Sequence, residues 1–244
     1  MTSTSFKKNI KLISFDLDDT LWDGQQAVIS AQQAMHSWLN KHHPSVAKKA
    51  LSGRYLELRI EIVNSQPHQT HNLTFIRKEI LRRLFIETGH TENQASSFAE
   101  SAFNVFFEKR NQVSYFKNAL TIIKHLKAHF QIAALTNGNA DISATGLKPV
   151  IDYFYSAESV GAAKPDTKMF QILLDDSKLE PEECIHVGDH PEHDILAAQS
   201  LGIKTIWFND KEKKWPEKSR PEGEIKELSL LPQAIQKICN KQQL

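Results

Sequence analysis

The chain has 244 residues, of which 40% are hydrophobic and 24% charged, the proportions of an ordinary globular protein. Its net charge of +1 gives no sign of the concentrated basic face that nucleic-acid partners require. The two cysteines are too few for a disulfide framework, and no apolar run is long enough to span a membrane. We therefore expect a cytoplasmic protein, a monomer or homodimer, with neither nucleic-acid nor membrane partners.

The first predicted element is a short buried strand that ends in a cluster of acidic residues. The apolar run over residues 10–15 predicts the strand, and Asp16, Asp18, Asp19 and Thr20 follow it. Carboxylates at the end of a buried strand repel one another and are costly to desolvate unless a cation or a proton lies among them. In open parallel sheets, ligands bind at that end of the strands. A solvated turn would use the same residue types, so the meaning of the cluster depends on the rest of the chain.

Residues 23–114 predict a small helical bundle. Four stripes of apolar residues recur at helical spacing: Val28, Ala31, Met35 and Trp38; Leu51, Tyr55, Leu58 and Ile62; Leu73, Ile76, Ile80 and Leu84; and Ala95, Phe98, Ala102 and Phe106. Pro44 and the polar stretch over residues 64–72 separate the helices, and the run 91–94 predicts a capping box that opens the fourth. We expect the aromatic side chains of these stripes to form a core rather than a cofactor site.

From residue 117 onward, predicted strands and helices alternate. The strands are expected over residues 132–135, 153–156, 184–187 and 203–208, and the helices over 119–129, 167–177, 191–201 and 229–241. Asp166 is available to cap the second of these helices, and the charged run 210–227 predicts a solvated loop. Such alternation predicts a parallel sheet with right-handed crossovers. We therefore predict an α/β fold with a Rossmann-like parallel-sheet core (residues 1–22 and 115–244), interrupted by a helical cap (residues 23–114).

Polar side chains follow four of the predicted strands, at ends that a parallel sheet brings to one edge. They are Asp16 and Asp18, Thr136 and Asn137, Lys164, and Asp189 with Asp194. Hard oxygen ligands without a Cys or His set suit Mg²⁺ rather than zinc. A pocket that combines Mg²⁺, an ammonium group, a hydroxyl and backbone amides is suited to a phosphoryl group. The chain has no Gly-rich P-loop, which excludes that class of phosphate-binding enzyme.

The polar ends, in their order and spacing, resemble the four motifs of the haloacid dehalogenase-like (HAD) phosphohydrolases. The matching segments are the runs 16–21, 135–138 and 164–165, and the pair 188–189 together with Asp194. The helical insert resembles the C1 cap of that superfamily, so the resemblance covers the whole chain. The runs 15–23 and 136–140 are also similar to the flavin mononucleotide phosphatase branch, whose members act on FMN and on a phosphorylated pyrimidine precursor of riboflavin. The resemblance implies a Mg²⁺-dependent phosphomonoesterase that acts on a small phosphorylated metabolite.

The same resemblance implies roles for individual residues. Asp16 would be the nucleophile that forms an aspartyl-phosphate, and Asp18 would be the general acid and base. Thr136 and the backbone amide of Asn137 would bind phosphoryl oxygens, while Lys164 would neutralise negative charge.

The metal site implied by the resemblance uses three aspartates. Mg²⁺ would take the Asp16 carboxylate, the backbone carbonyl of Asp18 and the carboxylate of Asp189. Asp194 has three open roles: support of the metal through water, an ion pair with Lys164, or a helix cap.

Several alternatives stay open. The dehalogenase branch lacks a carboxylate at the position of Asp18, so haloacid dehalogenation is not expected. A phosphotransferase such as a sugar-phosphate mutase, and a non-catalytic binding protein on the same fold, are the competing functions. The spacing of His186, His190 and His193 could suggest a metal site. We instead expect His186 to be buried in a strand and the other two histidines to lie in a loop. Four arginines of the cap are candidates for gripping the distal part of a substrate or for solvated helix faces: Arg54, Arg59, Arg77 and Arg83.

Overall fold

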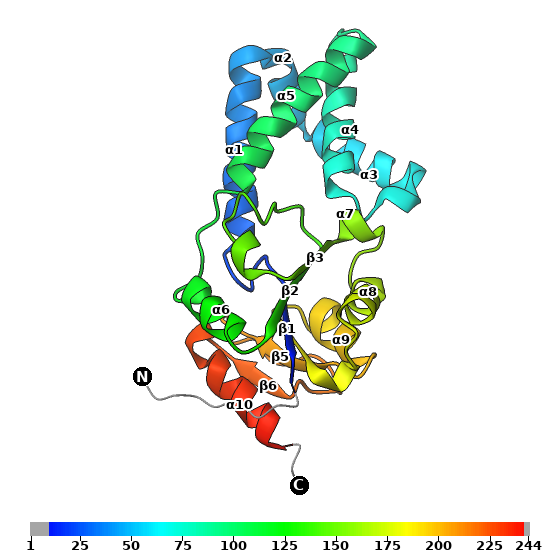
Figure 1. Cartoon of the computed structure of the whole chain (residues 1–244). Helices are drawn as coiled ribbons and strands as arrows, with labels where there is room; N and C mark the ends of the chain where they lie inside the picture. Colours follow the sequence, from blue (N-terminus) through cyan, green and yellow to red (C-terminus); the bar gives the residue numbers. More distant parts are fainter. Residues whose placement is uncertain (1–9, 242–244) are drawn as a thin grey trace. The chain divides into compact units, whose positions relative to one another are not determined.

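The computed structural model describes residues 10–241 (Figure 1). Contacts between Cα atoms divide these residues into two compact units. The α/β unit comprises residues 10–24, 114–138 and 146–241, and the helical unit comprises residues 25–113 and 139–145.

The α/β unit is built on a six-stranded, all-parallel sheet with the strand order β3-β2-β1-β4-β5-β6, which confirms the predicted fold class. The strands are β1 (Leu12–Phe15), β2 (Gln131–Thr136), β3 (Tyr153–Ser156), β4 (Cys184–Gly188), β5 (Lys204–Phe208) and β6 (Gly223–Ile225). All four residues of β1 are buried, as expected of a central strand with both faces covered. Phe15 is level with Ala134 of β2 and Val187 of β4, so the carboxyl ends of these three neighbouring strands lie at the same edge of the sheet.

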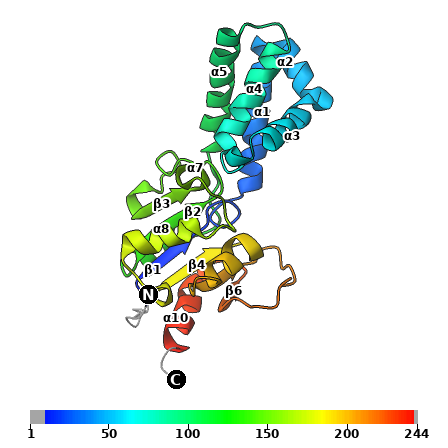
Figure 2. The same cartoon turned by 90° about the vertical axis from the view of Figure 1, so that its right-hand side faces the viewer.

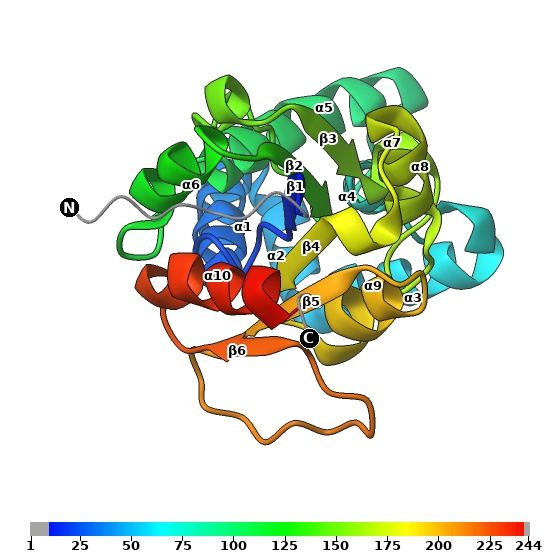
Figure 3. The ribbon, with the colours of Figure 1, turned by 60° about the horizontal axis from the view of Figure 1, so that its bottom comes forward.

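Helices cover both faces of this sheet (Figure 3). They are α6 (Ala119–Lys127), α7 (Ala157–Val160), α8 (Lys168–Ser177), α9 (Ala197–Gln199) and α10 (Leu231–Lys241). Helices α8 and α9 lie on one face, and α6 and α10 lie on the other (Figure 3). Leu12, Phe170 and Ala198 belong to the core on the α8 and α9 side. Asp166 accepts a hydrogen bond from the N–H of Lys168 (2.9 Å), although Thr167 occupies the N-cap position.

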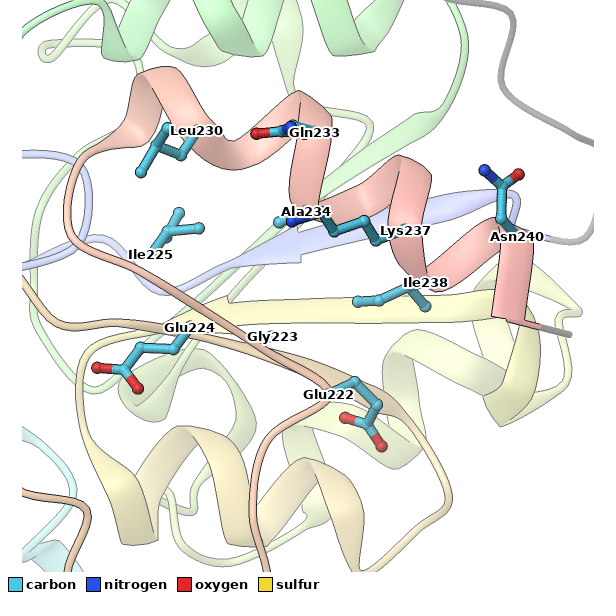
Figure 4. Close-up of a pocket in the computed structure, with 10 residues that line it drawn as sticks. All are labelled: Glu222, Gly223, Glu224, Ile225, Leu230, Gln233, Ala234, Lys237, Ile238 and Asn240. Carbon is cyan, nitrogen blue, oxygen red and sulfur yellow. The ribbon is translucent and has the colours of Figure 1, made fainter.

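The solvated loop predicted for residues 210–227 is partly wrong, because its C-terminal part forms β6. This three-residue strand pairs with β5 at the edge of the sheet and buries Ile225. It is too short and too charged to show an alternating pattern in the sequence. Together with α10, β6 lines a cavity of about 470 Å³ (Figure 4). The carboxylates of Glu222 and Glu224 on this cavity are already hydrogen-bonded to Thr205 and Asn209, so it offers no free acidic group for chemistry.

The chain leaves the α/β unit and returns to it at neighbouring points. Trp22 forms an antiparallel bridge with Tyr115, and the N–H of Phe116 donates to the carbonyl of Leu21 (2.9 Å). The rings of Trp22 and Tyr115 meet edge to face with centroids 5.4 Å apart. The two connections are therefore tied together within the α/β unit.

The helical unit is built from the helices α1 to α5 (Figure 2). They are α1 (Gly24–His42), α2 (Pro44–Lys49), α3 (Tyr55–Ser65), α4 (Leu73–Ile86) and α5 (Glu92–Arg110). The apolar stripes predicted for α4 and α5 are largely buried in one core, and the predicted capping box is present. Thr91 accepts from the N–H of Gln94, and its own N–H donates to the Gln94 side chain (3.1 Å). In the part of the chain described, no helix is both long and apolar enough to cross a membrane.

The second predicted stripe is wrong at its first residue, since the side chain of Leu51 is 73% exposed. Gly53 lies between Leu51 and Tyr55 with φ = +93°, a conformation that only glycine adopts without strain. The helical path is broken there, so Leu51 does not share a face with the residues that follow. The buried stripe of α3 consists of Leu58 and Ile62.

A cluster of rings in the helical unit predicts a pH-dependent stability. The His43 ring lies 4.5 Å from that of Phe98 and 4.9 Å from that of Phe85. Burial, and then the nearby His90 and His42, lower the pKa of His43. Because the neutral form is favoured in the folded state, its contribution is complete above the unfolded pKa of about 6.5 and is lost as the pH falls below it.

We therefore expect the His43→Phe variant to lose less melting temperature than the wild type between about pH 7.5 and about pH 5.5. Thermal unfolding followed by circular dichroism measures the difference. His68→Gln, at an exposed position of the same unit, is the matched control and should follow the wild type. Equal acid sensitivity of His43→Phe and the wild type would contradict this prediction.

Candidate active site

The carboxyl ends of β1, β2 and β4 bring charged side chains from distant parts of the sequence together. Asp16 follows β1 directly, and its N–H donates to the carbonyl of Val187 on β4 (2.9 Å). Lys164 comes from the loop beyond β3, and its Nζ lies 2.7 Å from Asp16 Oδ1. Carboxylate oxygens of Asp16, Asp189 and Asp194 all lie within 4.8 Å of one another. Three acidic groups and one ammonium thus occupy one small region at this edge of the sheet.

Lys164 is the centre of this cluster. Its Nζ donates to Asp16 Oδ1 (2.7 Å), to Asp194 Oδ1 (2.6 Å) and to the carbonyl of Leu135 (2.8 Å), which uses all three N–H groups. The side chain is only 1% exposed. A buried ammonium with every donor satisfied between two carboxylates is held in one position. Of the three roles left open for Asp194, the ion pair with Lys164 is therefore present.

Burial and the neighbouring charges set the protonation of the cluster. Burial raises the pKa of Asp16 well above its usual value, and Asp194 and Asp189 add to this, while Lys164 acts in the opposite direction. Burial also opposes ionisation of Asp194, but Lys164 and His186 together outweigh it and hold that pKa below its usual range. Burial, then Asp194 and Asp19, raises the pKa of Asp189 to about 7. Asp16 and Asp189 therefore carry repulsion that a further cation would relieve.

Gly188 gives Asp194 its place in the cluster. A Cβ at Gly188 would collide with the carboxyl group of Asp194, so this close approach requires glycine. The segment Pro191–Leu196, predicted as ordinary helix, is a wider helical turn in which Asp194 is buried. The N–H of His190 donates to Asp194 Oδ2 (3.0 Å), so both oxygens of this carboxylate are engaged.

Asp18 stands apart from the three clustered carboxylates. Its Oδ1 accepts from the indole N–H of Trp22 (2.8 Å), which fixes the half-buried side chain. Asp19, with φ = +60°, accepts from the N–H of Gly24 (3.2 Å). The hydroxyl of Thr20 donates to Asp189 (3.4 Å) and links the first acidic loop to the end of β4.

Thr136 and Asn137 lie where β2 ends. The Thr136 hydroxyl oxygen is buried and accepts from the N–H of Gly138 (2.9 Å), so its proton stays available for a ligand. Asn137 Nδ2 donates to the carbonyl of Lys164 (2.8 Å), and the N–H of Lys164 donates to Asn137 Oδ1 (2.7 Å). This paired contact positions the Lys164 loop, a role for the Asn137 side chain that sequence reasoning did not identify. Only its backbone amide had a predicted use.

His186 supports the cluster from within the sheet. It lies in register with Ser14 on β1, and its Nδ1 is 2.9 Å from the Ser14 hydroxyl. Its Nε2 is 3.4 Å from Asp194 Oδ1, and burial lowers its pKa, which favours the neutral ring. His190 and His193 stack on one another with ring centroids 3.8 Å apart. The three histidines thus comprise one buried ring and a stacked pair, and they lie outside the acidic group that could hold a metal ion.

The donor set fits a hard divalent cation. Carboxylate oxygens are the ligands that Mg²⁺ prefers, and those of three aspartates converge here from the segments that follow β1 and β4. Of the predicted metal ligands, the side chains of Asp16 and Asp189 lie in this group, and that of Asp18 does not. The predicted contact of Asp18 would be made through its backbone carbonyl, so its side chain is not required in the group.

Comparisons with known proteins give a consistent picture. Residues 10–202 match the family model of the haloacid dehalogenase-like hydrolases. The chain is 25% identical to the 5-amino-6-(5-phospho-D-ribitylamino)uracil phosphatase YigB of Escherichia coli, over 93% of this chain and 96% of that protein. It is 28% identical to a glyceraldehyde 3-phosphate phosphatase of Pyrococcus furiosus, over 82% of this chain and 81% of that one.

Among solved structures, a dehalogenase is more similar in sequence than the two phosphatases above. The crystal structure of a 2-haloacid dehalogenase from Pseudomonas syringae pv. Tomato DC3000 is similar with a TM-score of 0.89 and 34% sequence identity. The similarity covers 93% of this chain and 98% of that one. The relatives thus include proteins named as phosphatases and proteins named as dehalogenases.

Proposed function

The chain belongs to the haloacid dehalogenase-like hydrolases, and from this premise we propose that it is a phosphatase, a Mg²⁺-dependent phosphomonoesterase with Asp16 as its nucleophile. The observation that supports this most strongly is the buried cluster of Asp16, Lys164, Asp189 and Asp194 at one edge of the sheet. The partner is a small phosphorylated metabolite. The cytoplasmic location, the oligomeric state and the absence of nucleic-acid and membrane partners stay predictions.

The proposed reaction has two steps. Asp16 attacks the phosphorus and forms an aspartyl-phosphate, while Asp18 gives a proton to the leaving oxygen of the substrate. Asp18 then takes a proton from water, whose oxygen attacks the phosphorus, so that phosphate leaves and Asp16 is regenerated. The Thr136 hydroxyl and the N–H of Asn137 would donate to phosphoryl oxygens, and Lys164 would offset negative charge on Asp16.

Asp16, Asp189 and the backbone carbonyl of Asp18 would hold Mg²⁺, with Asp194 close by. When bound, the ion would compensate the charge that gathers on the transferring phosphoryl group. Hydrogen bonds within the chain position the other reacting groups. Asn137 holds the loop that carries Lys164, and the indole N–H of Trp22 holds the Asp18 carboxylate.

The proposed substrate is a phosphate of the riboflavin pathway, such as FMN or its ribitylamino-uracil precursor. The similarity to YigB and the motif runs shared with the flavin mononucleotide phosphatase branch support this choice. Purified enzyme with Mg²⁺ should release free phosphate from these compounds faster than from glyceraldehyde 3-phosphate or sugar phosphates. Formation of an isomerised sugar phosphate without free phosphate would instead establish a phosphotransferase. No turnover of any phosphate would favour a binding protein.

Haloacid dehalogenation is the second candidate, and the similarity to the Pseudomonas syringae enzyme favours it. A halide leaves carbon as a stable anion and needs no proton, whereas the alkoxide leaving from a phosphate monoester does. The Asp18 carboxyl supplies such a proton donor. We therefore expect release of phosphate from p-nitrophenyl phosphate and no halide from 2-chloropropionate. Halide release without phosphate release would reverse the assignment.

Metal binding should be measurable apart from turnover. The pKa of Asp189 is raised to about 7. In the metal-free protein, the free energy of unfolding therefore falls as the pH rises from the ordinary pKa of an aspartate to about 7, because this buried carboxyl group must then ionise. A cation among the carboxylates relieves this repulsion. We expect Mg²⁺ to raise the melting temperature relative to EDTA, more at about pH 8 than at about pH 6, and Asp189→Asn to reduce the effect. An unchanged melting temperature at both pH values would count against the shared metal site.

A further inference from the structure

The four arginines singled out in the sequence fall into two sets in the helical unit. Two of them are neutralised by glutamates. Arg54 forms ion pairs with Glu61 (2.7 Å) and Glu87 (2.7 Å), and Arg83 Nε lies 2.8 Å from Glu79. These two side chains are engaged within the unit itself.

Arg59 and Arg77 make the second set. Among residues 10–241, no carboxylate forms an ion pair with either guanidinium. Both instead line one small cavity of about 20 Å³, together with Tyr55, Leu73, Ile76 and Ile80. Tyr55 and Arg59 are four residues apart on α3, and the other four residues recur at helical spacing on α4, so each helix presents one face to the cavity.

Arg77 is a half-buried cation that lacks an anion. Its Nε is buried and has no hydrogen-bond partner among the described residues. Its Cζ lies 3.7 Å from the centroid of the Phe106 ring, which compensates part of the charge. Burial, and the nearby Arg59 and Arg110, lower its pKa, while Tyr55 raises it. An arginine stays protonated under these conditions, so a partly buried positive charge with positive neighbours remains.

We propose that Arg77, Arg59 and the hydroxyl of Tyr55 form a binding site for an anionic oxygen of a carboxylate or a phosphate. The cavity has room for about one water-sized group, so one oxygen would enter and the rest of the anion would stay outside. Arg77 would contact that oxygen from the buried side, and the exposed Arg59 would close over the outer part. The site goes beyond the proposed hydrolysis, because its anion is either a free ion or a second acidic group of the substrate.

Sulfate is the probe for the free ion. At constant ionic strength, sulfate should raise the melting temperature of the full chain more than chloride does, and calorimetry should give an affinity. We expect at least a tenfold weaker affinity in Arg77→Met and in Arg59→Met. The matched control Arg83→Met removes a paired arginine of the same unit and should bind sulfate like the wild type. Because Arg59 is exposed, its variant keeps the test valid even if Arg77→Met is unstable.

A second arm identifies the source of the anion. If it is part of the substrate, Arg59→Met should lower kcat/KM for a sugar bisphosphate relative to p-nitrophenyl phosphate by tenfold or more, and Arg83→Met should leave that ratio unchanged. An unchanged ratio with sulfate binding lost assigns the site to a free ion. Sulfate binding that is equal in all variants, or absent from the wild type, would overturn the proposal. Hydrolysis of p-nitrophenyl phosphate tests the proposed function separately.

Discussion

Asp16→Asn is expected to lower turnover of p-nitrophenyl phosphate by about 10³-fold or more, because an amide cannot act as the nucleophile. The substitution keeps the size of the side chain at the point where β1 meets β4. A steady-state assay at saturating Mg²⁺ measures the loss. Asp175→Asn, at an exposed position of α8, is the matched control and should keep full activity.

The same variant has an opposite signature in stability, which separates lost chemistry from lost folding. Burial and two neighbouring carboxylates raise the pKa of Asp16, so its removal relieves repulsion in the metal-free protein. We expect Asp16→Asn to melt at or above the wild-type temperature in EDTA and to gain less from Mg²⁺. Appreciable turnover by a well-folded Asp16→Asn protein would reject Asp16 as the nucleophile.

Lys164→Met is expected to remove activity and to destabilise the protein by about 3–5 kcal/mol, the usual cost of leaving one side of a buried ion pair uncompensated. The substitution leaves Asp16 and Asp194 side by side without their shared cation, and it leaves the Leu135 carbonyl without this donor. Urea unfolding measures the change in the free energy of unfolding. A pH of about 8 is chosen because it favours the ionised form of both Asp16 and Asp194, which then repel each other.

Two comparisons sharpen that result. Lys168→Met removes an exposed lysine at the start of α8 and should change stability by less than about 0.5 kcal/mol. Mg²⁺ should recover part of the stability of Lys164→Met, because it supplies positive charge to the same carboxylates. A Lys164→Met protein that matches the wild type in urea would show that the cluster does not depend on this ammonium.

The sequence was sufficient to predict the parallel sheet and the loops that carry Asp16, Lys164 and Asp189, because a strand end followed by polar residues is a local pattern. It was insufficient for the contacts made by Asn137 and His186. Their partners, the Lys164 backbone and Ser14, are distant in sequence, and the register of the sheet brings them together.

Two predictions about the fold, the burial of Leu51 and the loop over residues 210–227, were wrong for local reasons. Leu51 fits the spacing of a helix, but a single backbone angle at Gly53 takes it out of the stripe. The strand β6 is three residues long and contains one buried side chain, Ile225, which is too little for a periodic signal. Both features depend on backbone geometry rather than on the order of apolar and polar residues.

Trp22 and Tyr115 are paired within the α/β unit, so the insertion of residues 25–113 does not separate the two points at which the chain leaves and re-enters this unit. The two junctions are paired within the α/β unit, so the chain segments on either side of the insertion lie next to each other, as they would if a short turn joined them. Such an arrangement is modular: the inserted sequence can diverge or be exchanged while the geometry around Asp16 is inherited unchanged.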